Sequence, residues 1–213
     1  MEKLSYQSKV SAAKRRTAAY RKISAQDMAL CAVFTTLTAV GAFIRVPVPV
    51  VPFTLQFFFT MLAGLLLGGR KGALSVGVYI LLGLVGLPVF AQGGGFWYIL
   101  KPSFGYLLGF MLAAYVTGSM VERRKRRKKL VTGWVMAVNF LGLLIVYGIG
   151  MVYYYVVCNY VIDTPIAVGP LFLYCFVLAV PGDICLCILA AILTVRVKPV
   201  FDRMTESAAG RKV

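Results

Sequence analysis

The sequence has no histidine and only seven acidic residues among its 213 positions. Without imidazole ligands, we expect neither a zinc site nor a haem site. We see no nucleophile beside a base and no second buried acid for proton transfer, so we do not expect an enzyme or a resident cofactor. A Walker A motif is also missing, so any step driven by ATP must come from partner subunits. The five cysteines lie within or at the edge of apolar segments, where we interpret them as small packing residues.

Charge of either sign is scarce outside a few basic clusters. Only 14% of the residues are charged and 60% are hydrophobic, whereas about a quarter of a soluble domain is charged. Apolar runs of ~17–25 residues are long enough to cross a bilayer. Six segments qualify, and the sequence therefore predicts an all-α polytopic membrane protein, a six-helix transmembrane bundle. The segments are Met28–Ile44, Phe53–Gly69, Gly72–Phe90, Phe104–Val121, Val131–Val157 and Gly169–Val197.

The basic residues orient this bundle, because short loops rich in Lys and Arg stay in the cytosol. All but two of the 23 basic residues fall in the N-terminal tail, in the Arg70–Lys71 pair, in the Arg123–Lys129 run or from Arg196 onward. An even number of spans places these four groups on one face, so we expect both termini in the cytosol. Only Arg45 and Lys101 lie on the outward side. The simplest interpretation of the basic runs is anchoring to anionic lipid, and a nucleic-acid partner is not expected.

The chain reads as one membrane domain with two short tails. We expect a basic cytosolic tail over residues 1–25, a transmembrane substrate-binding domain over 26–197 and a cytosolic tail over 198–213. The first ~25 residues are polar and basic, so we expect no cleavable signal peptide. Ala25, Ala29 and Ala32 form a small-residue face at the cytosolic start of the first span. Such a face suits either packing within the bundle or docking to a partner helix.

Both long outward loops have unusual compositions. In the loop from Arg45 to Gln56, three prolines favour an extended path. In the loop from Leu87 to Gly105, three consecutive glycines permit positive φ angles and are followed at once by Phe96, Trp97 and Tyr98. These aromatic residues are compatible with an interfacial belt or with a loop that closes a ligand against aromatic walls.

Asp183 is the only acid inside a predicted span, where ionisable residues are rare and usually functional. It follows Pro181-Gly182, a pair expected to break the helix. About 13 residues separate Asp183 from Arg196, or ~20 Å of helix, which places Asp183 in the outer half of the membrane. The carboxylate could cap the broken helix or bind a ligand. Around it we predict an outward-facing aromatic pocket with one carboxylate and several neutral hydrogen-bonding groups. Our candidate binding residues are Asp183, Gln56, Arg45, Gln92, Gly94, Trp97, Tyr98, Lys101, Tyr155 and Asn159.

Four stretches of the sequence resemble one known family, the BioY family. They are Val51–Gln56 (VPFTLQ), Leu65–Ala73 (LLLGGRKGA), Tyr79–Phe90 (YILLGLVGLPVF) and Lys101–Phe110 (KPSFGYLLGF), and Pro181-Gly182-Asp183 matches a further motif. The resemblance covers roughly residues 26–196. It implies a six-helix substrate-binding (S) component of an energy-coupling-factor (ECF) transporter that captures biotin from outside. It also implies docking on a transmembrane coupling subunit, the T component, driven by two cytosolic ABC-type ATPases.

Two positions depart from that family's pattern. Lys101 stands where a small residue often precedes the proline, and the second departure follows the motif aspartate. The motif aspartate is often followed three residues later by a lysine in the binding site, and here that position is Leu186. For biotin itself, Asp183 would accept hydrogen bonds from the ureido N–H groups, and Arg45 or Lys101 would attract the valerate carboxylate. The alternatives are an S component for another vitamin and a structural or regulatory membrane protein that transports nothing.

Overall fold

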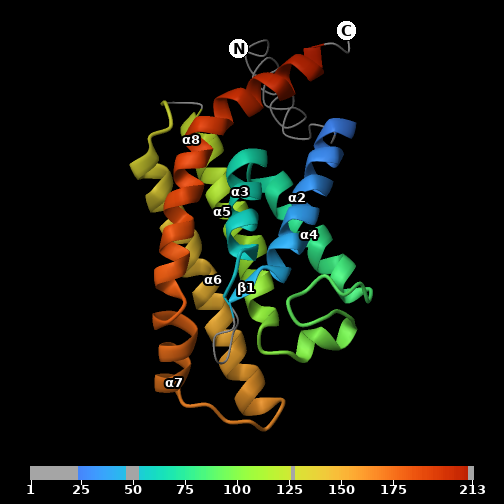
Figure 1. The fold of residues 1–213 in the computed structure, drawn as a ribbon, viewed down its shortest axis with the longest axis vertical. Helices are drawn as coiled ribbons and strands as arrows, with labels where there is room; N and C mark the ends of the chain where they lie inside the picture. The colour runs from blue at the N-terminus through green and yellow to red at the C-terminus, as the bar shows by residue number, and fades with distance from the viewer. Residues whose placement is uncertain (1–23, 47–52, 126–127, 211–213) are drawn as a thin grey trace, which may run out of the picture.

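The structure, a computed structural model, describes residues 24–46, 53–125 and 128–210. Most of the basic N-terminal tail, the three loop prolines, Arg126, Arg127 and the last three residues lie outside the described residues. The described chain forms a helical bundle with one two-stranded ribbon (Figure 1), which confirms the predicted all-α architecture. The elements are α2 (Ala25–Phe43), β1 (Arg45–Val46), β2 (Phe53–Thr54), α3 (Gln56–Leu67), α4 (Gly69–Leu84), the 3₁₀ helix η1 (Phe96–Leu100), α5 (Phe104–Lys125), α6 (Thr132–Tyr160), α7 (Val168–Phe172), the π-helix η2 (Leu173–Val177) and α8 (Val180–Gly210).

Helix α2 begins at a capping box. The Ser24 hydroxyl accepts a hydrogen bond from the Asp27 amide, and the Asp27 carboxylate accepts one from the Ser24 amide, both at 3.2 Å. Lys71, at the start of α4, donates to the same carboxylate at 2.5 Å. The side chain of Thr35 then donates to the backbone of Ser75 at 2.8 Å, so polar contacts hold α2 against α4 along much of its length.

Helices α3 and α4 form a tight pair joined at Gly68, whose φ of 90° is one that residues with a side chain rarely adopt. Glycines also let three helices meet closely. A Cβ atom at Gly64 would lie 2.5 Å from the carbonyl oxygen of Ala114 in α5, and one at Gly72 would lie 2.6 Å from the Cα of Gly64. Helix α3 is therefore surrounded, and most of its residues are buried.

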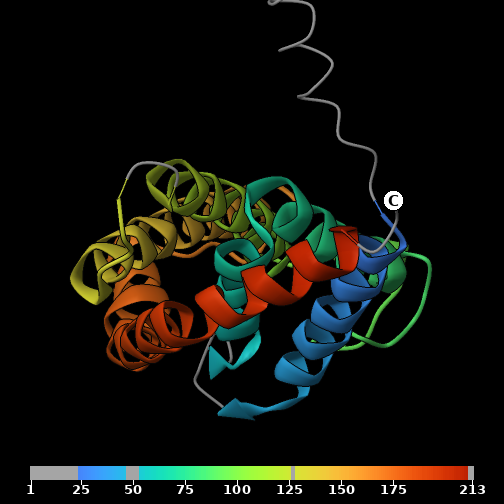
Figure 2. The same ribbon diagram turned by 90° about the horizontal axis from the view of Figure 1, so that it is seen from above.

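The last apolar segment changes its helical form before Asp183. Helix α7 passes into the π-helix η2 and a short turn before α8 begins, so the irregular stretch lies just ahead of Pro181. Pro181 itself lies in the first turn of α8, where a missing N–H is tolerated. The expected helix break thus takes the form of a π-helical turn. Helix α8 continues past position 197 to Gly210, with Pro199 inside it, and Figure 2 shows its last part crossing one end of the bundle.

Five of the six predicted apolar segments each correspond to one helix. The sixth corresponds to α7, η2 and α8 in succession, which together form the α7–α8 stack. In the described part of the chain, four stretches are long and apolar enough to cross a membrane: Ala25–Phe43, Phe104–Lys125, Thr132–Tyr160 and Val168–Thr205. Helix α3 is shorter, with 12 residues, and α4 has 16. Helix α2 begins and α8 ends at the same end of the bundle, as an even number of passes requires (Figure 1).

Candidate functional site

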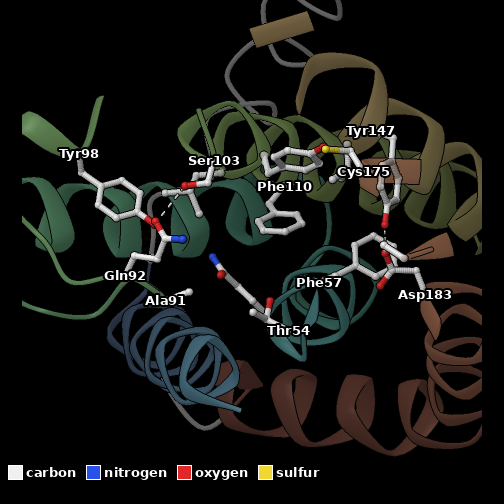
Figure 3. A pocket seen from close by; sticks show the side chains of 15 residues that line it. Thr54, Phe57, Ala91, Gln92, Tyr98, Ser103, Phe110, Tyr147, Cys175 and Asp183 are labelled. Carbon is white, nitrogen blue, oxygen red and sulfur yellow. Dashed lines mark hydrogen bonds between the residues drawn. The ribbon is translucent and has the colours of Figure 1, made fainter. Parts of the chain in front are cut away.

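A cavity of about 70 Å³ lies among α3, α5, α6 and the α7–α8 stack, and residues of the loop between α4 and α5 form part of its wall (Figure 3). Four of the ten predicted binding residues line it together, although they are far apart in the sequence: Gln56, Gln92, Tyr98 and Asp183. The full lining is Thr54, Gln56, Phe57, Ala91, Gln92, Tyr98, Ser103, Tyr106, Leu107, Phe110, Val146, Tyr147, Cys175, Ala179 and Asp183.

Asp183 is 6% exposed and supplies the carboxylate of the cavity wall. The Tyr147 hydroxyl, from α6, donates to its Oδ2 atom at 2.5 Å, and Figure 3 shows the two side chains pointing at one another. Hydrogen bonds to an ionised carboxylate stabilise more than those between neutral groups. The contact orients Asp183 and leaves its Oδ1 atom with accepting capacity for another partner.

Two further polar groups in the lining have no hydrogen-bond partner among the described residues. They are the amide nitrogen Nε2 of Gln56, at the start of α3, and the hydroxyl of Tyr106, on α5. Both side chains are buried. An unsatisfied buried donor costs ~1–3 kcal/mol, so native proteins rarely keep one without a reason. A polar ligand in the cavity would satisfy both groups.

The remaining lining is largely apolar. Phe57 on α3 and Phe110 on α5 face each other with ring centroids 6.2 Å apart, and Leu107 and Val146 extend the same surface. The ring of Tyr106 packs edge-on against Tyr147 at 5.9 Å. Apolar and aromatic walls with a few placed polar groups are typical of small-molecule sites.

The two cations that the sequence predicts on the outward side, Arg45 and Lys101, meet on one short segment of the cavity wall, Ala91-Gln92. Arg45 donates to the carbonyl of Ala91 at 2.6 Å, and Lys101 donates to the carbonyl of Gln92 at 2.9 Å. Lys101 also lies over the Tyr98 ring, 4.9 Å from its centroid. Neither cation lines the cavity, yet both hold the backbone that does. They therefore place positive charge beside the cavity and fix the wall at the same time.

Tyr98 supports this wall from the 3₁₀ helix η1. Its ring packs on Phe90 at 4.5 Å, and its hydroxyl accepts a hydrogen bond from Ser103 at 3.4 Å (Figure 3). Burial raises the pKa of the Tyr98 hydroxyl, so the phenol stays neutral at ordinary pH. The preceding glycines take the expected conformation, with φ of 105° at Gly93 and 109° at Gly95.

The other four predicted binding residues do not line the cavity. Trp97 is 78% exposed. Gly94 lies where a Cβ atom would approach the carbonyl oxygen of Leu87 at 2.1 Å, so it shapes the loop. Asn159 donates to the carbonyls of Tyr155 and Ile166, at 2.9 and 3.3 Å, and thereby ties the end of α6 to the loop that follows.

Several lining residues are absent from our predicted set. Tyr147 belongs to a cluster of tyrosines visible in the sequence, but nothing in the sequence separates it from its neighbours. Tyr106, Phe57 and Phe110 lie in apolar segments where every helix face carries similar residues. The one sequence signal that points to Tyr106 is its place in the Lys101–Phe110 stretch.

On α2, the predicted small-residue face is exposed at Ala25, Ala29 and Ala32. The side chains of α2 that are buried lie elsewhere on the helix, for example Cys31 and Phe34. Within the part of the chain that the structure describes, no group of three or more His, Cys, Asp and Glu side chains could hold a metal ion.

Long apolar helices around a small, mostly apolar cavity with one buried carboxylate define a helical membrane protein with a small-molecule site. Comparison with known proteins identifies the family. The chain belongs to the BioY family, whose model matches residues 13–203.

Named relatives share this assignment. The chain is 48% identical over 178 residues to the probable biotin transporter BioY of Lysinibacillus sphaericus, covering 84% of this chain and 89% of the relative. It is 41% identical to the biotin transporter BioY of Thermotoga maritima, covering 78% and 92%. Among solved structures, it resembles the S-component for biotin from an ECF-type ABC transporter, with a TM-score of 0.68, 26% identity and coverage of 82% and 91%. The relatives are named as transporters, and the long apolar helices of this chain are those of a membrane protein.

Proposed function

We propose that this protein captures biotin from outside the cell and serves as the S component of an ECF transporter that takes biotin up across the cytoplasmic membrane. The observation that carries the proposal is the cavity itself. It contains one buried carboxylate, Asp183, and two unpartnered neutral groups within apolar walls. Biotin has the complementary groups: a ureido ring with two N–H donors and one carbonyl, an apolar bicycle and an anionic tail.

The orientation of the ligand follows from where the charges lie. Asp183 would accept a charge-assisted hydrogen bond from a ureido N–H group, so the ring system enters first. The bicycle would then pack against the aromatic surface that Phe57 and Phe110 form together. The valerate carboxylate would be left toward Ala91-Gln92, where Arg45 and Lys101 supply positive charge.

The volume of the cavity adds a requirement. About 70 Å³ is far below the ~300–1,000 Å³ of typical small-molecule sites, so a wall must move to admit the ligand. The loop between α4 and α5 is the candidate, because it contains the glycines and supplies Ala91, Gln92 and Tyr98 to the lining. Its contacts with Arg45 and Lys101 would break and re-form as biotin enters.

The energy for uptake would come from partners. We propose that a transmembrane T component and two cytosolic ABC-type ATPases complete the transporter, and that the chain needs no cofactor of its own. Both termini would lie in the cytosol, at the basic end of the bundle. The exposed face formed by Ala25, Ala29 and Ala32 offers a surface on which the helices of the T component could pack closely.

Binding of labelled biotin to the detergent-purified protein tests the proposal directly. We expect tight binding by the wild type. Asp183→Asn should weaken it by about 1.5–3 kcal/mol, the range for a hydrogen bond to a charged group, or roughly 10- to 150-fold in Kd. Asp163→Asn, which changes an exposed acid in an outward loop, is the matched control and should bind normally.

Two outcomes would separate the possible roles of Asp183. Normal affinity with reduced thermal stability in Asp183→Asn would mean that the carboxylate only supports the start of α8. An absence of biotin binding by the folded wild-type protein would sink the proposed function as a whole.

A further inference from the structure

The Tyr106 hydroxyl is the most unusual polar group of the cavity wall outside Asp183. Tyr106 is 7% exposed, and its oxygen has no hydrogen-bond partner among the described residues. The Cys175 thiol, which is only a weak hydrogen-bonding group, lies beside it. Buried polar groups are almost always paired, so an exception calls for an explanation. A molecule that enters the cavity would supply the missing partner of this hydroxyl.

The surrounding residues keep the Tyr106 ring in place. The ring packs edge-on against Tyr147, with an interplanar angle of 87°, and a Cβ atom at Gly150 of α6 would lie only 2.5 Å from it. These contacts leave the ring little freedom to turn its hydroxyl elsewhere. A group held in its binding position before the ligand arrives loses little entropy on binding.

The two tyrosine hydroxyls are not equivalent. Tyr147 already donates its proton to Asp183 Oδ2 at 2.5 Å, so it has none left for a ligand. Tyr106 has only the Cys175 thiol beside its hydroxyl, and sulfur accepts hydrogen bonds weakly, so a ligand oxygen would be the better partner for its proton. This end of the cavity therefore presents an acceptor, the Oδ1 atom of Asp183, and a donor, the hydroxyl of Tyr106, on two helices that both contact α6. A urea group presents the complementary pair, an N–H donor next to a carbonyl acceptor.

We infer that Tyr106 is a specificity-determining residue, whose hydroxyl donates to the ureido carbonyl oxygen while Asp183 accepts from the adjacent ureido N–H. The inference rests on the proposed function and deepens it, because it assigns recognition of the carbonyl to a residue on α5. The cavity then selects a urea ring over rings that keep the N–H groups but lack a good acceptor. A site built to bond one polar group discriminates strongly against analogues without it.

A thermodynamic cycle tests this assignment, in which two protein variants are each measured with two ligands. The second ligand is the thiourea analogue of biotin, in which sulfur replaces the ureido oxygen and accepts hydrogen bonds weakly, while both N–H groups and the net charge remain. Kd is measured for the wild type and for Tyr106→Phe with each ligand, using purified full-length protein. Tyr154→Phe is the matched control, because Tyr154 packs against the same core without lining the cavity.

We expect Tyr106→Phe to raise the Kd of biotin about 3- to 10-fold, as for one neutral hydrogen bond. The Kd of the thiourea analogue should hardly change, so the preference of the protein for biotin should shrink by the same factor. Tyr154→Phe should bind both ligands as the wild type does. Without ligand, Tyr106→Phe should unfold at the same temperature as the wild type or a higher one, because it removes an unpaired buried hydroxyl.

Three results would overturn the inference. Equal losses for both ligands would show that Tyr106 only packs, and no loss for either would show that its hydroxyl does not touch the ligand. A shrinking preference in Gln56→Leu but not in Tyr106→Phe would assign the carbonyl to α3 instead. Failure of the proposed function looks different, because the wild type would then bind neither ligand.

Discussion

Gly150 shows how a residue outside the cavity controls one of its side chains. A methyl group at this position would lie 2.5 Å from the Tyr106 ring, so Gly150→Ala should push the ring and its hydroxyl out of position. We expect the Kd for biotin to rise several-fold. Alanine favours helix over glycine by ~1 kcal/mol, so α6 itself should not be weakened.

Gly148→Ala provides the control, on the same helix two residues earlier. A Cβ atom there would have no neighbour within 4 Å, so this variant should bind biotin as the wild type does. Titration of both variants with labelled biotin checks the expectation. Indistinguishable affinities in the two variants would argue that Tyr106 adjusts to the added methyl group without cost.

At the level of single residues, a residue type that is rare in membrane spans could be assigned to the site from the sequence, and a common residue type could not. Asp183 stands out because it is the only acid within a predicted span, and the structure places it in the cavity wall. Tyr106 and Tyr147 do not stand out, because tyrosine occurs 12 times in the chain. Their importance depends on which hydroxyl finds a partner, and that depends on packing between helices distant in the sequence.

Among the elements, the loop between α4 and α5 is the one expected to move. Arg45 and Lys101 each bond to a carbonyl within it, and Gly93 and Gly95 take φ angles that suit glycine. We expect biotin to slow amide hydrogen exchange in a peptide covering residues 87–101, because the ligand would hold the loop closed over the cavity. Mass spectrometry with and without biotin measures this.

The loop that joins α6 to α7, residues 161–167, is the internal comparison for this experiment. It supplies no residue to the cavity lining, so its exchange should change little. Equal slowing in both loops would indicate a general stabilisation of the protein. Unchanged exchange in residues 87–101 would count against a moving loop.

Hydropathy located all six helical segments but not their internal form. The length of an apolar run does not reveal that α3 is a short helix between a ribbon and the Gly68 turn, because an extended stretch and a helix can be equally apolar. Pro181 and Gly182 correctly signalled an irregularity in the last segment. Its form, a π-helical turn placed before them, depends on how α7 and α8 pack on the rest of the bundle.

For the whole molecule, the cavity and the predicted cytosolic end are built differently. The predicted cytosolic end is held by ionic contacts between helices. Lys71 binds Asp27, and Lys125 binds Asp202 at 2.6 Å. The buried Lys198 amine on α8 donates to the Leu66 carbonyl at the end of α3, at 2.6 Å. Helices α3 and α8 therefore each connect the cavity, through Gln56 and Asp183, to this tied end.

Docking to the coupling subunit should depend on the exposed alanine face of α2. Ala29 lies between Ala25 and Ala32 on this face, and a large side chain would keep a partner helix from approaching closely. We expect Ala29→Trp to block co-purification with the T component and ATPases and to abolish biotin uptake in cells. Biotin binding by the isolated protein should stay almost unchanged, because α2 contributes no residue to the cavity lining.

Ala137→Trp adds the same bulk at an exposed alanine of α6 and should leave assembly and uptake intact. The pair therefore separates a specific docking face from a general intolerance of tryptophan on the lipid-facing surface. Loss of biotin binding in purified Ala29→Trp would mean that this face packs inside the bundle. Normal assembly and uptake in Ala29→Trp would move the proposed docking surface to another helix.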